Sequence, residues 1–249
     1  MESIRNAKAI LKRELASYFN SPVAYVFLFF FLMFAGFFTF MLGGYYEYRQ
    51  ADLGAFFRWH PWLYLVLAPA ATMRLWAEER RGGTIELLLT MPIRPIDAIL
   101  GKFVAAWLFM GLALALTFPI VLTTVYLGSP DPGVVVVSYI GSFMLAGAYL
   151  SIGTLTSAMT RNQVIGFILA VFISFFLLLA GWPPITNMLM RLPERWQWLL
   201  RMTASLSWMP HFESCQRGVL DLRDMLYYVS VIVFMLFGTH LVLENRKSL

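Results

Sequence analysis

The sequence predicts an all-α integral membrane protein with six transmembrane helices in a single domain, residues 1–249. Hydrophobic residues make up 59% of the chain and charged residues only 13%. The mean hydropathy of +0.69 lies well outside the range of soluble domains. Stretches of about twenty apolar residues, the length at which a helix crosses the hydrocarbon core, recur along the sequence.

Six such stretches are predicted to cross the membrane. The second is short, and the third contains Pro119, which we expect to kink its helix. The fourth is rich in Gly, Ala, Ser and Thr, which allow helices to pack closely. The six predicted spans are residues 22–42, 60–76, 102–127, 134–158, 164–182 and 225–243.

The distribution of Lys and Arg predicts that both chain termini are cytoplasmic. In this orientation 12 of the 19 Lys and Arg residues lie in cytoplasmic segments and 7 lie outside, as the positive-inside rule requires. Six of the 8 tryptophans then lie at or beyond the outer interface, where tryptophan commonly anchors membrane proteins. We therefore expect a multi-pass membrane protein. Its net charge of +5 indicates topology and contact with lipid headgroups rather than nucleic-acid binding.

The first 21 residues are predicted to form an interfacial helix on the inner leaflet. Apolar residues recur at helical spacing over residues 2–19, and basic residues occupy the opposite face. Such a helix lies in the plane of the membrane with its cations near lipid phosphates. A solvated N-terminal helix is the alternative. The basic residues predicted to face the lipid are Arg5, Lys8, Lys12 and Arg13.

The outer loop, residues 183–224, is predicted to contain one or two short helices that dip back into the outer leaflet. Its segment WQWLLRMTASLSWM, residues 196–209, is aromatic and apolar but only about 14 residues long. That length is typical of re-entrant or interfacial segments rather than of transmembrane spans.

No catalytic, cofactor-binding or metal-binding motif is recognisable in the sequence. It lacks the pattern G-x-x-x-x-G-K-[ST] of a phosphate-binding loop. Its three histidines are scattered, with no carboxylates at ligand spacing. Cys215 is the only cysteine, so no intrachain disulfide can form. We therefore expect a non-catalytic subunit with no metal or cofactor of its own.

Residues 77–95, AEERRGGTIELLLTMPIRP, predict a short capped helix between the second and third spans, within a cytoplasmic loop at residues 77–101. Gly82 and Gly83 permit a sharp turn out of the second span. Thr84 is a suitable N-cap for the helix that follows, and a proline ends that helix. This segment is too short to cross a bilayer.

One side of this short helix is apolar and the residues around it are charged. Ile85, Leu88 and Leu89 form the apolar stripe, and Glu86 lies in the first turn, where a negative charge suits the helix dipole. An exposed apolar stripe bordered by charges needs a partner groove or the lipid surface to cover it.

The same stretch resembles the first cytoplasmic loop of ABC-2 type permeases, the membrane subunits of type V ATP-binding-cassette transporters. The resemblance lies in EERRGGTIELLLTMPIRPIDAILGK and extends in length and number of spans over essentially the whole chain. A second stretch, HFESCQRGVLDLRDMLYY, resembles the segment before the last span in the gliding-motility-type subgroup. The residues of this outer motif are His211, Phe212, Arg217, Gly218, Asp221 and Asp224.

This resemblance implies that the short helix docks in a groove of a separate ATPase subunit, which binds ATP and Mg²⁺. Two ATPases and two permeases, as a homodimer or with a related subunit, would form a transporter in the bacterial inner membrane, with export the expected direction. A periplasmic or membrane accessory protein is a further partner that the sequence leaves open. The expected contact residues at the rim are Glu78, Glu79, Arg80 and Arg81. Those of the turn and the inserted helix are Gly82, Thr84, Ile85, Glu86, Leu88 and Leu89.

Two other functional classes remain as alternatives. A secondary transporter or channel would be favoured by charged residues inside the spans or by inverted repeats, and neither is evident in the sequence. A non-transporting membrane scaffold that transmits force or a signal is equally compatible with the aromatic outer loop. The short helix itself could lie on lipid as a capped amphipathic turn instead of docking on a protein.

Overall fold

The computed structural model describes residues 2–47, 52–84, 94–182 and 206–245, with single positions at 184, 185, 187 and 198. Within these residues every regular element is a helix. Five segments of this described part are long and apolar enough to cross a membrane, which confirms an all-helical membrane fold. These segments are Pro22–Leu42, Pro95–Leu127, Pro132–Met159, Gln163–Ala180 and Leu222–Glu244.

The first and third predicted spans are each built from two consecutive helices. The first consists of α2 (Pro22–Phe37), which continues directly into the π-helix η1 (Phe38–Leu42). The third consists of α7 (Pro95–Ala115) and α8 (Phe118–Leu127). Because a proline ring clashes with the carbonyl four residues earlier, Pro119 disturbs the helix at the last residue of α7. The predicted kink is therefore present, and the helix begins seven residues earlier than the predicted span.

The fourth span, α9 (Pro132–Met159), is the central helix of the bundle. Half of the most apolar 18-residue stretch of α9 is buried. The corresponding stretches of the first span (Pro22–Leu42) and of α14 (Leu222–Glu244) are each 22% buried. Helix α9 packs against α14, α4, α7, α10 (Gln163–Ala180) and α13 (Met209–Gln216). A methyl group at Gly141 would lie 2.8 Å from the sulfur of Cys215. The small residues of α9 therefore allow the close helix packing that the sequence predicted.

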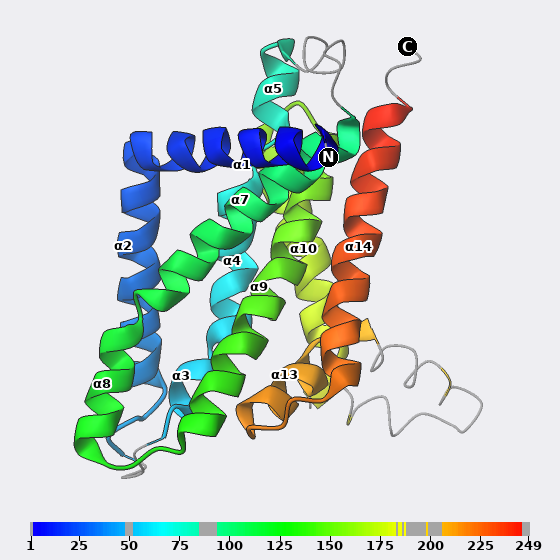
Figure 1. Cartoon of the computed structure of the whole chain (residues 1–249). Coiled ribbons are helices and arrows are strands. Elements are labelled where there is room, and N and C mark those ends of the chain that lie inside the picture. Colours follow the sequence, from blue (N-terminus) through cyan, green and yellow to red (C-terminus); the bar gives the residue numbers. More distant parts are fainter. Residues whose placement is uncertain are drawn as a thin grey trace.

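The second predicted span is not confirmed by helix length. Its helix, α4 (His60–Thr72), has 13 residues, about 20 Å, whereas the hydrocarbon core is about 30 Å thick. It nevertheless runs through the middle of the bundle, with α3 (Gly54–Arg58) at one end and α5 (Ala77–Arg81) at the other (Figure 1). Most of its side chains are buried.

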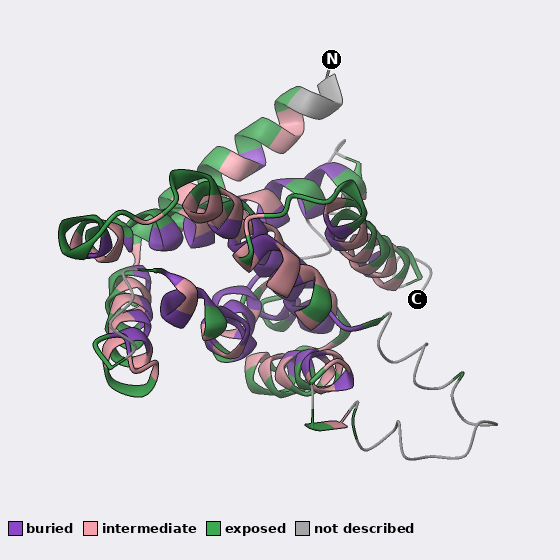
Figure 2. Cartoon of the chain, turned by 90° about the horizontal axis from the view of Figure 1, so that it is seen from below, coloured by how far each residue is buried: buried purple, intermediate pink, exposed green. Residues whose placement is uncertain are grey.

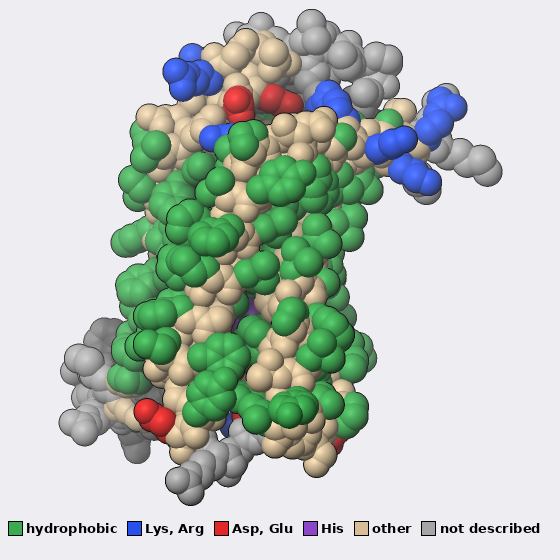
Figure 3. All heavy atoms as spheres, turned by 90° about the vertical axis from the view of Figure 1, so that its left-hand side faces the viewer, with side chains coloured by type: hydrophobic (Ala, Val, Ile, Leu, Met, Phe, Trp, Pro, Cys, Tyr) green, Lys and Arg blue, Asp and Glu red, His purple; other side chains and the backbone are tan. Residues whose placement is uncertain are grey.

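The two ends of the bundle differ in their elements and in their charge. Helix α1 (Glu2–Asn20) lies crosswise over one end of the bundle, and α5 and the last turns of α14 lie at this same end (Figure 1). Helices α3 and α13 lie at the opposite end (Figure 1). On the face shown in Figure 3, a broad hydrophobic surface separates the ends, and the visible Lys and Arg side chains gather mainly at the end that carries α1.

The distribution of buried and exposed side chains is the one expected for a helix bundle in lipid. Buried residues face the middle of the bundle, whereas exposed residues cover its outside (Figure 2). Many of the exposed side chains are large and apolar, for example Phe172 on α10 and Phe234 on α14, as expected for surfaces in contact with acyl chains. The first turns of α1 project beyond the rest of the bundle (Figure 2).

The re-entrant helices predicted in the outer loop are not confirmed, because most of residues 183–205 lie outside the described residues. Helix α13 is described, and it packs under α9 and α14. Two buried aromatic side chains anchor α13 there: Trp208 lies just before the helix and Phe212 lies within it. The last part of the loop is thus a short helix docked on the spans.

Candidate functional site

The loop that was predicted to contact an ATPase begins with α5 at the α1 end of the bundle. Gly82 follows its last residue, and Gly83 has φ +70°, a left-handed conformation that glycine adopts without strain. The Thr84 hydroxyl donates a hydrogen bond of 3.3 Å to the carbonyl of Glu79. The sharp turn predicted at the glycine pair is therefore present. The predicted helix with Ile85, Glu86, Leu88 and Leu89 lies outside the described residues.

Helix α5 is fixed to the end of α9 by buried hydrogen bonds. The Ser157 hydroxyl oxygen accepts from the backbone N–H groups of Trp76 (3.1 Å) and Ala77 (3.2 Å), and its O–H donates to the carbonyl of Met73. The Arg80 guanidinium donates a 2.6 Å hydrogen bond to the carbonyl of Ala158. A cation suits this position because the last carbonyls of a helix lack intrahelical partners.

The four charged residues expected at the rim of a partner contact differ in what they touch. Arg80 is buried against α9, and Glu79 forms ion pairs within the chain. Glu78 and Arg81 are exposed. The structure thus gives Arg80 and Glu79 an intramolecular role, and it leaves Glu78 and Arg81 free to face a partner. The contact with an ATPase stays a prediction for all four.

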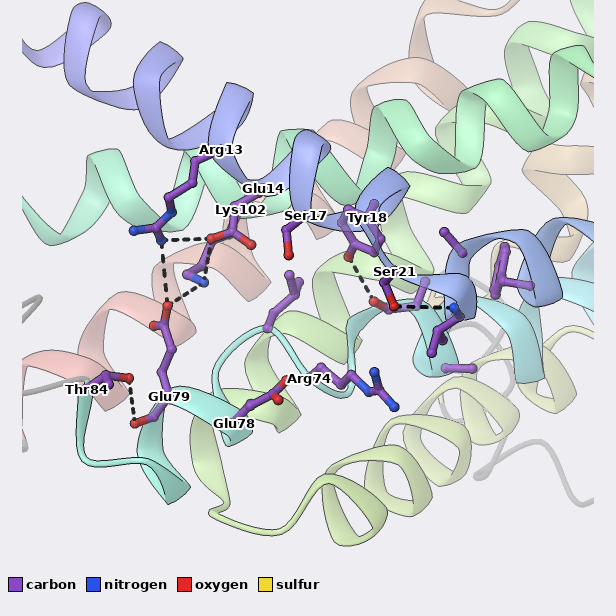
Figure 4. Close-up of a pocket in the computed structure, with 16 residues that line it drawn as sticks. Arg13, Glu14, Ser17, Tyr18, Ser21, Arg74, Glu78, Glu79, Thr84 and Lys102 are labelled. Atoms are coloured by element: carbon purple, nitrogen blue, oxygen red, sulfur yellow. Dashed lines mark hydrogen bonds and ion pairs between the residues drawn. The ribbon is translucent and has the colours of Figure 1, made fainter.

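A buried lysine joins α5 to α1 and to the start of the third span. The Lys102 ammonium lies 2.8 Å from Glu79 and 3.1 Å from Glu14, and the Arg13 guanidinium lies 2.9 Å from Glu14 (Figure 4). The side chain of Lys102 is only 3% exposed, and its ammonium lies 5.3 Å from the ring centroid of Trp76. We call Arg13, Glu14, Glu79 and Lys102 the Lys102 cluster.

Charge pairing keeps the carboxylate of Glu14 ionised inside this cluster. Burial alone would raise the pKa of the Glu14 carboxyl, but the charges of Lys102 and Arg13 outweigh burial and hold its pKa below the usual range. Within the cluster, two carboxylates therefore lie among two basic side chains, and each carboxylate has a basic side chain within 3.1 Å. A buried cation that is paired in this way avoids the cost of an isolated charge.

Helix α1 is docked on the bundle along its apolar face. Ile10 is buried where α1 crosses α7, and the Tyr18 ring stacks on Phe109 with centroids 4.8 Å apart. The Tyr18 hydroxyl also donates to the carbonyl of Ala71 at 3.0 Å. This docking holds α1 to the bundle, and it is compatible both with an interfacial helix and with the alternative of a solvated one. Its basic residues are exposed as predicted, and their contact with lipid stays a prediction: Arg5, Lys8, Lys12 and Arg13.

The outer motif forms the junction between α13 and α14. His211 Nδ1 lies 2.7 Å from Asp224 Oδ1, and its ring stacks on Tyr227. Asp221 caps α14 by accepting a hydrogen bond from the backbone of Arg223. The remaining members serve the same junction: Phe212 is buried, Arg217 lies 3.9 Å from Glu213, and Gly218 has φ +78°.

Sequence reasoning did not find the Lys102 cluster or the role of Ser157. Lys102 was expected to open the third span, and Glu14 was not singled out. The two residues are 88 positions apart, so no local pattern connects them. The available signal was a lone lysine next to the apolar run of α7, since a lysine at such a position requires a partner.

Comparison with known protein families agrees with this geometry. The sequence model of the ABC-2 family transporter proteins matches residues 8–236. The chain belongs to this family. It is therefore a multi-pass membrane permease of an ABC transporter, and membership implies association with an ATPase subunit. A search of curated proteins found no match. The family match does not distinguish subgroups, so the gliding-motility type stays a prediction.

Proposed function

We propose that this ABC-2 permease is a non-catalytic subunit that converts the closure of a separate ATPase into movement of its spans, in an exporter with two permeases and two ATPases. The segment that would dock on the ATPase is the loop that begins at α5. The observation that supports this proposal is the anchoring of α5. Helix α5 is hydrogen-bonded to α9 through Ser157 and Arg80, and it is connected to α7 and α1 through the ion pairs of the Lys102 cluster.

This anchoring supports a mechanical role because it leaves α5 little freedom of its own. Buried hydrogen bonds and ion pairs cost several kcal/mol to break singly, since each would leave a polar group unsatisfied. A displacement of α5 is therefore expected to carry the ends of α7 and α9 with it, and α1 as well. A loop that merely lay on the lipid surface would need no such attachments.

The direct test of the proposal is ATP hydrolysis by the permease with and without its partner. The purified permease alone is expected to show no turnover above a contaminant control, because it contains no phosphate-binding loop. The complex with the ATPase should hydrolyse ATP, and a variant ATPase without its Walker A lysine should abolish that turnover. Hydrolysis by the permease alone would refute the assignment of a non-catalytic subunit.

We also propose six crossings with both termini in the cytoplasm. Helix α1 and the last turns of α14 lie at the same end of the bundle (Figure 1), which requires an even number of crossings. Among the described residues, five segments are long enough to span. Helix α4 connects the two ends and supplies the sixth crossing, together with the residues that continue from it into α5.

Cysteine labelling tests this topology, but the native cysteine is unsuitable. Cys215 is buried, and burial raises the pKa of its thiol to about 11, so it should react slowly in the folded protein. In a Cys215→Ala background, Ser129→Cys should be labelled from outside intact cells by an impermeant maleimide. Arg161→Cys should be labelled only after the inner membrane is permeabilised. The opposite pattern would reverse the proposed orientation.

A further inference from the structure

A half-open cavity of about 740 Å³ lies beneath α1, where α1 turns into α2 (Figure 4). Its walls come from α1, α2, α4, α5 and α7, and neither α9 nor α13 contributes to it. The cavity lies at the level where the chain passes from the helix that lies across the end of the bundle into the first span. In a membrane, this level is the boundary between headgroups and acyl chains.

The walls of this cavity divide into an apolar part and a polar part. The polar part carries hydroxyl and charged groups of α1, α5, α7 and the residues that connect α4 to α5, together with Ser21 and Thr84. Sites that combine an apolar wall with a few convergent polar groups are typical of ligand pockets. The apolar residues come from α2, the end of α4 and the turn after it: Val23, Ala24, Phe27, Ala70, Ala71 and Leu75.

The lining charges sum to zero, with three cations and three carboxylates. Four of these charges neutralise one another within the Lys102 cluster. The other two are Arg74 and Glu78, which are exposed and form no ion pair within the part of the chain that the structure describes. Both side chains lie on the same wall of the cavity (Figure 4). As far as the described residues define it, the cavity therefore offers one cation and one carboxylate without an ion-pair partner, beside an apolar surface.

We infer that this cavity binds a zwitterionic phospholipid with a phosphoethanolamine headgroup. The Arg74 guanidinium matches the phosphate, since arginine binds phosphate oxygens through two parallel N–H donors. The Glu78 carboxylate matches the ammonium, and Ser17 on the facing helix supplies a hydroxyl donor. The acyl chains lie against the apolar wall and continue along α2, where Val23 is 45% exposed.

The charge pattern distinguishes this headgroup from the other common ones. In a lipid with a glycerol headgroup the phosphate would meet Arg74 in the same way, but the uncharged glycerol would leave the Glu78 carboxylate without a cation, and the lipid would keep a net negative charge. A choline headgroup has no N–H donor for Glu78. Phosphoethanolamine satisfies both unpaired charges at once, and a site with net zero charge favours a ligand with net zero charge.

Native mass spectrometry of the delipidated permease tests this inference. The probes are phosphatidylethanolamine, phosphatidylcholine and phosphatidylglycerol with identical acyl chains. We expect phosphatidylethanolamine to bind at least tenfold more tightly than phosphatidylglycerol. Arg74→Ala should lower the affinity for phosphatidylethanolamine by about tenfold or more, and tenfold corresponds to about 1.4 kcal/mol of binding free energy. Glu78→Gln should reduce the preference for phosphatidylethanolamine over phosphatidylglycerol.

Two controls separate the cavity from general attraction to a basic surface. Arg81→Ala removes an exposed arginine at the same end of the bundle that does not line the cavity, and it should leave all three affinities unchanged. Ala70→Phe fills the apolar part of the cavity without altering its charge, and it should lower the affinity for all three lipids. Free phosphoethanolamine should bind at least tenfold more weakly than the lipid. Equal affinity for the three lipids, or equal losses in Arg74→Ala and Arg81→Ala, would overturn the inference.

Discussion

Replacing Leu88 by Asp is expected to reduce recovery of the partner ATPase by about a hundredfold or more. If the apolar stripe of Ile85, Leu88 and Leu89 inserts into a groove of the ATPase, the substitution buries a charge without a partner. Such a charge costs several kcal/mol at an interface, and each 1.4 kcal/mol is about tenfold in affinity. The measurement is a pull-down of the ATPase with wild-type and Leu88→Asp permeases expressed at equal level.

Arg81→Ala is the matched control for this experiment. Arg81 is exposed at the end of α5, and a partly solvated charge at the rim of an interface usually contributes about 1 kcal/mol or less. Its removal should therefore reduce recovery far less than Leu88→Asp does. Arg80→Ala is not a suitable control, because Arg80 is bonded to the end of α9. Equal recovery with wild type and Leu88→Asp would favour the alternative in which the short helix lies on lipid.

The spans and the surface helix were predictable because the membrane imposes strong local rules. A helix must satisfy its own backbone groups in hydrocarbon, so run length alone locates α2, α9, α10 and α14 to within a few residues. The kink follows from the chemistry of Pro119. Helix α4 was harder to assign because its apolar run is short, and its crossing depends on neighbours that bury it rather than on its length.

The intramolecular role of the charged loop was not predictable to the same degree. Arg80 and Arg81 have the same chemistry in the sequence, but adjacent residues on a helix point about 100° apart. One of them therefore meets the end of α9 and the other faces outward, and only the packing of α5 decides which. The pairing of Lys102 with Glu14 likewise depends on α1 folding back over α7. No periodicity within either helix encodes that contact.

Replacing Lys102 by Met is expected to destabilise the permease by about 3 kcal/mol, which is the cost of removing one partner from a buried ion pair. The substitution keeps the side-chain volume and removes the cation that lies between Glu14 and Glu79. The two carboxylates would then share only Arg13, whose guanidinium lies 3.9 Å from Glu79 and is 60% exposed. Thermal unfolding of the purified protein in one detergent measures the effect as a fall in the transition midpoint.

A double-mutant cycle shows whether this cost comes from charge. Removing one carboxylate together with the cation, in Lys102→Met/Glu79→Gln, should recover part of the lost stability, because fewer like charges remain buried together. Additive losses in the double variant would show that Lys102 acts through packing alone.

The same variants also test the proposed mechanical role. Lys102→Met permease that still binds the ATPase should support less stimulated transport, because α5 would no longer be held to α7. Undiminished transport by such a complex would show that movement of the loop does not reach the spans through this lysine.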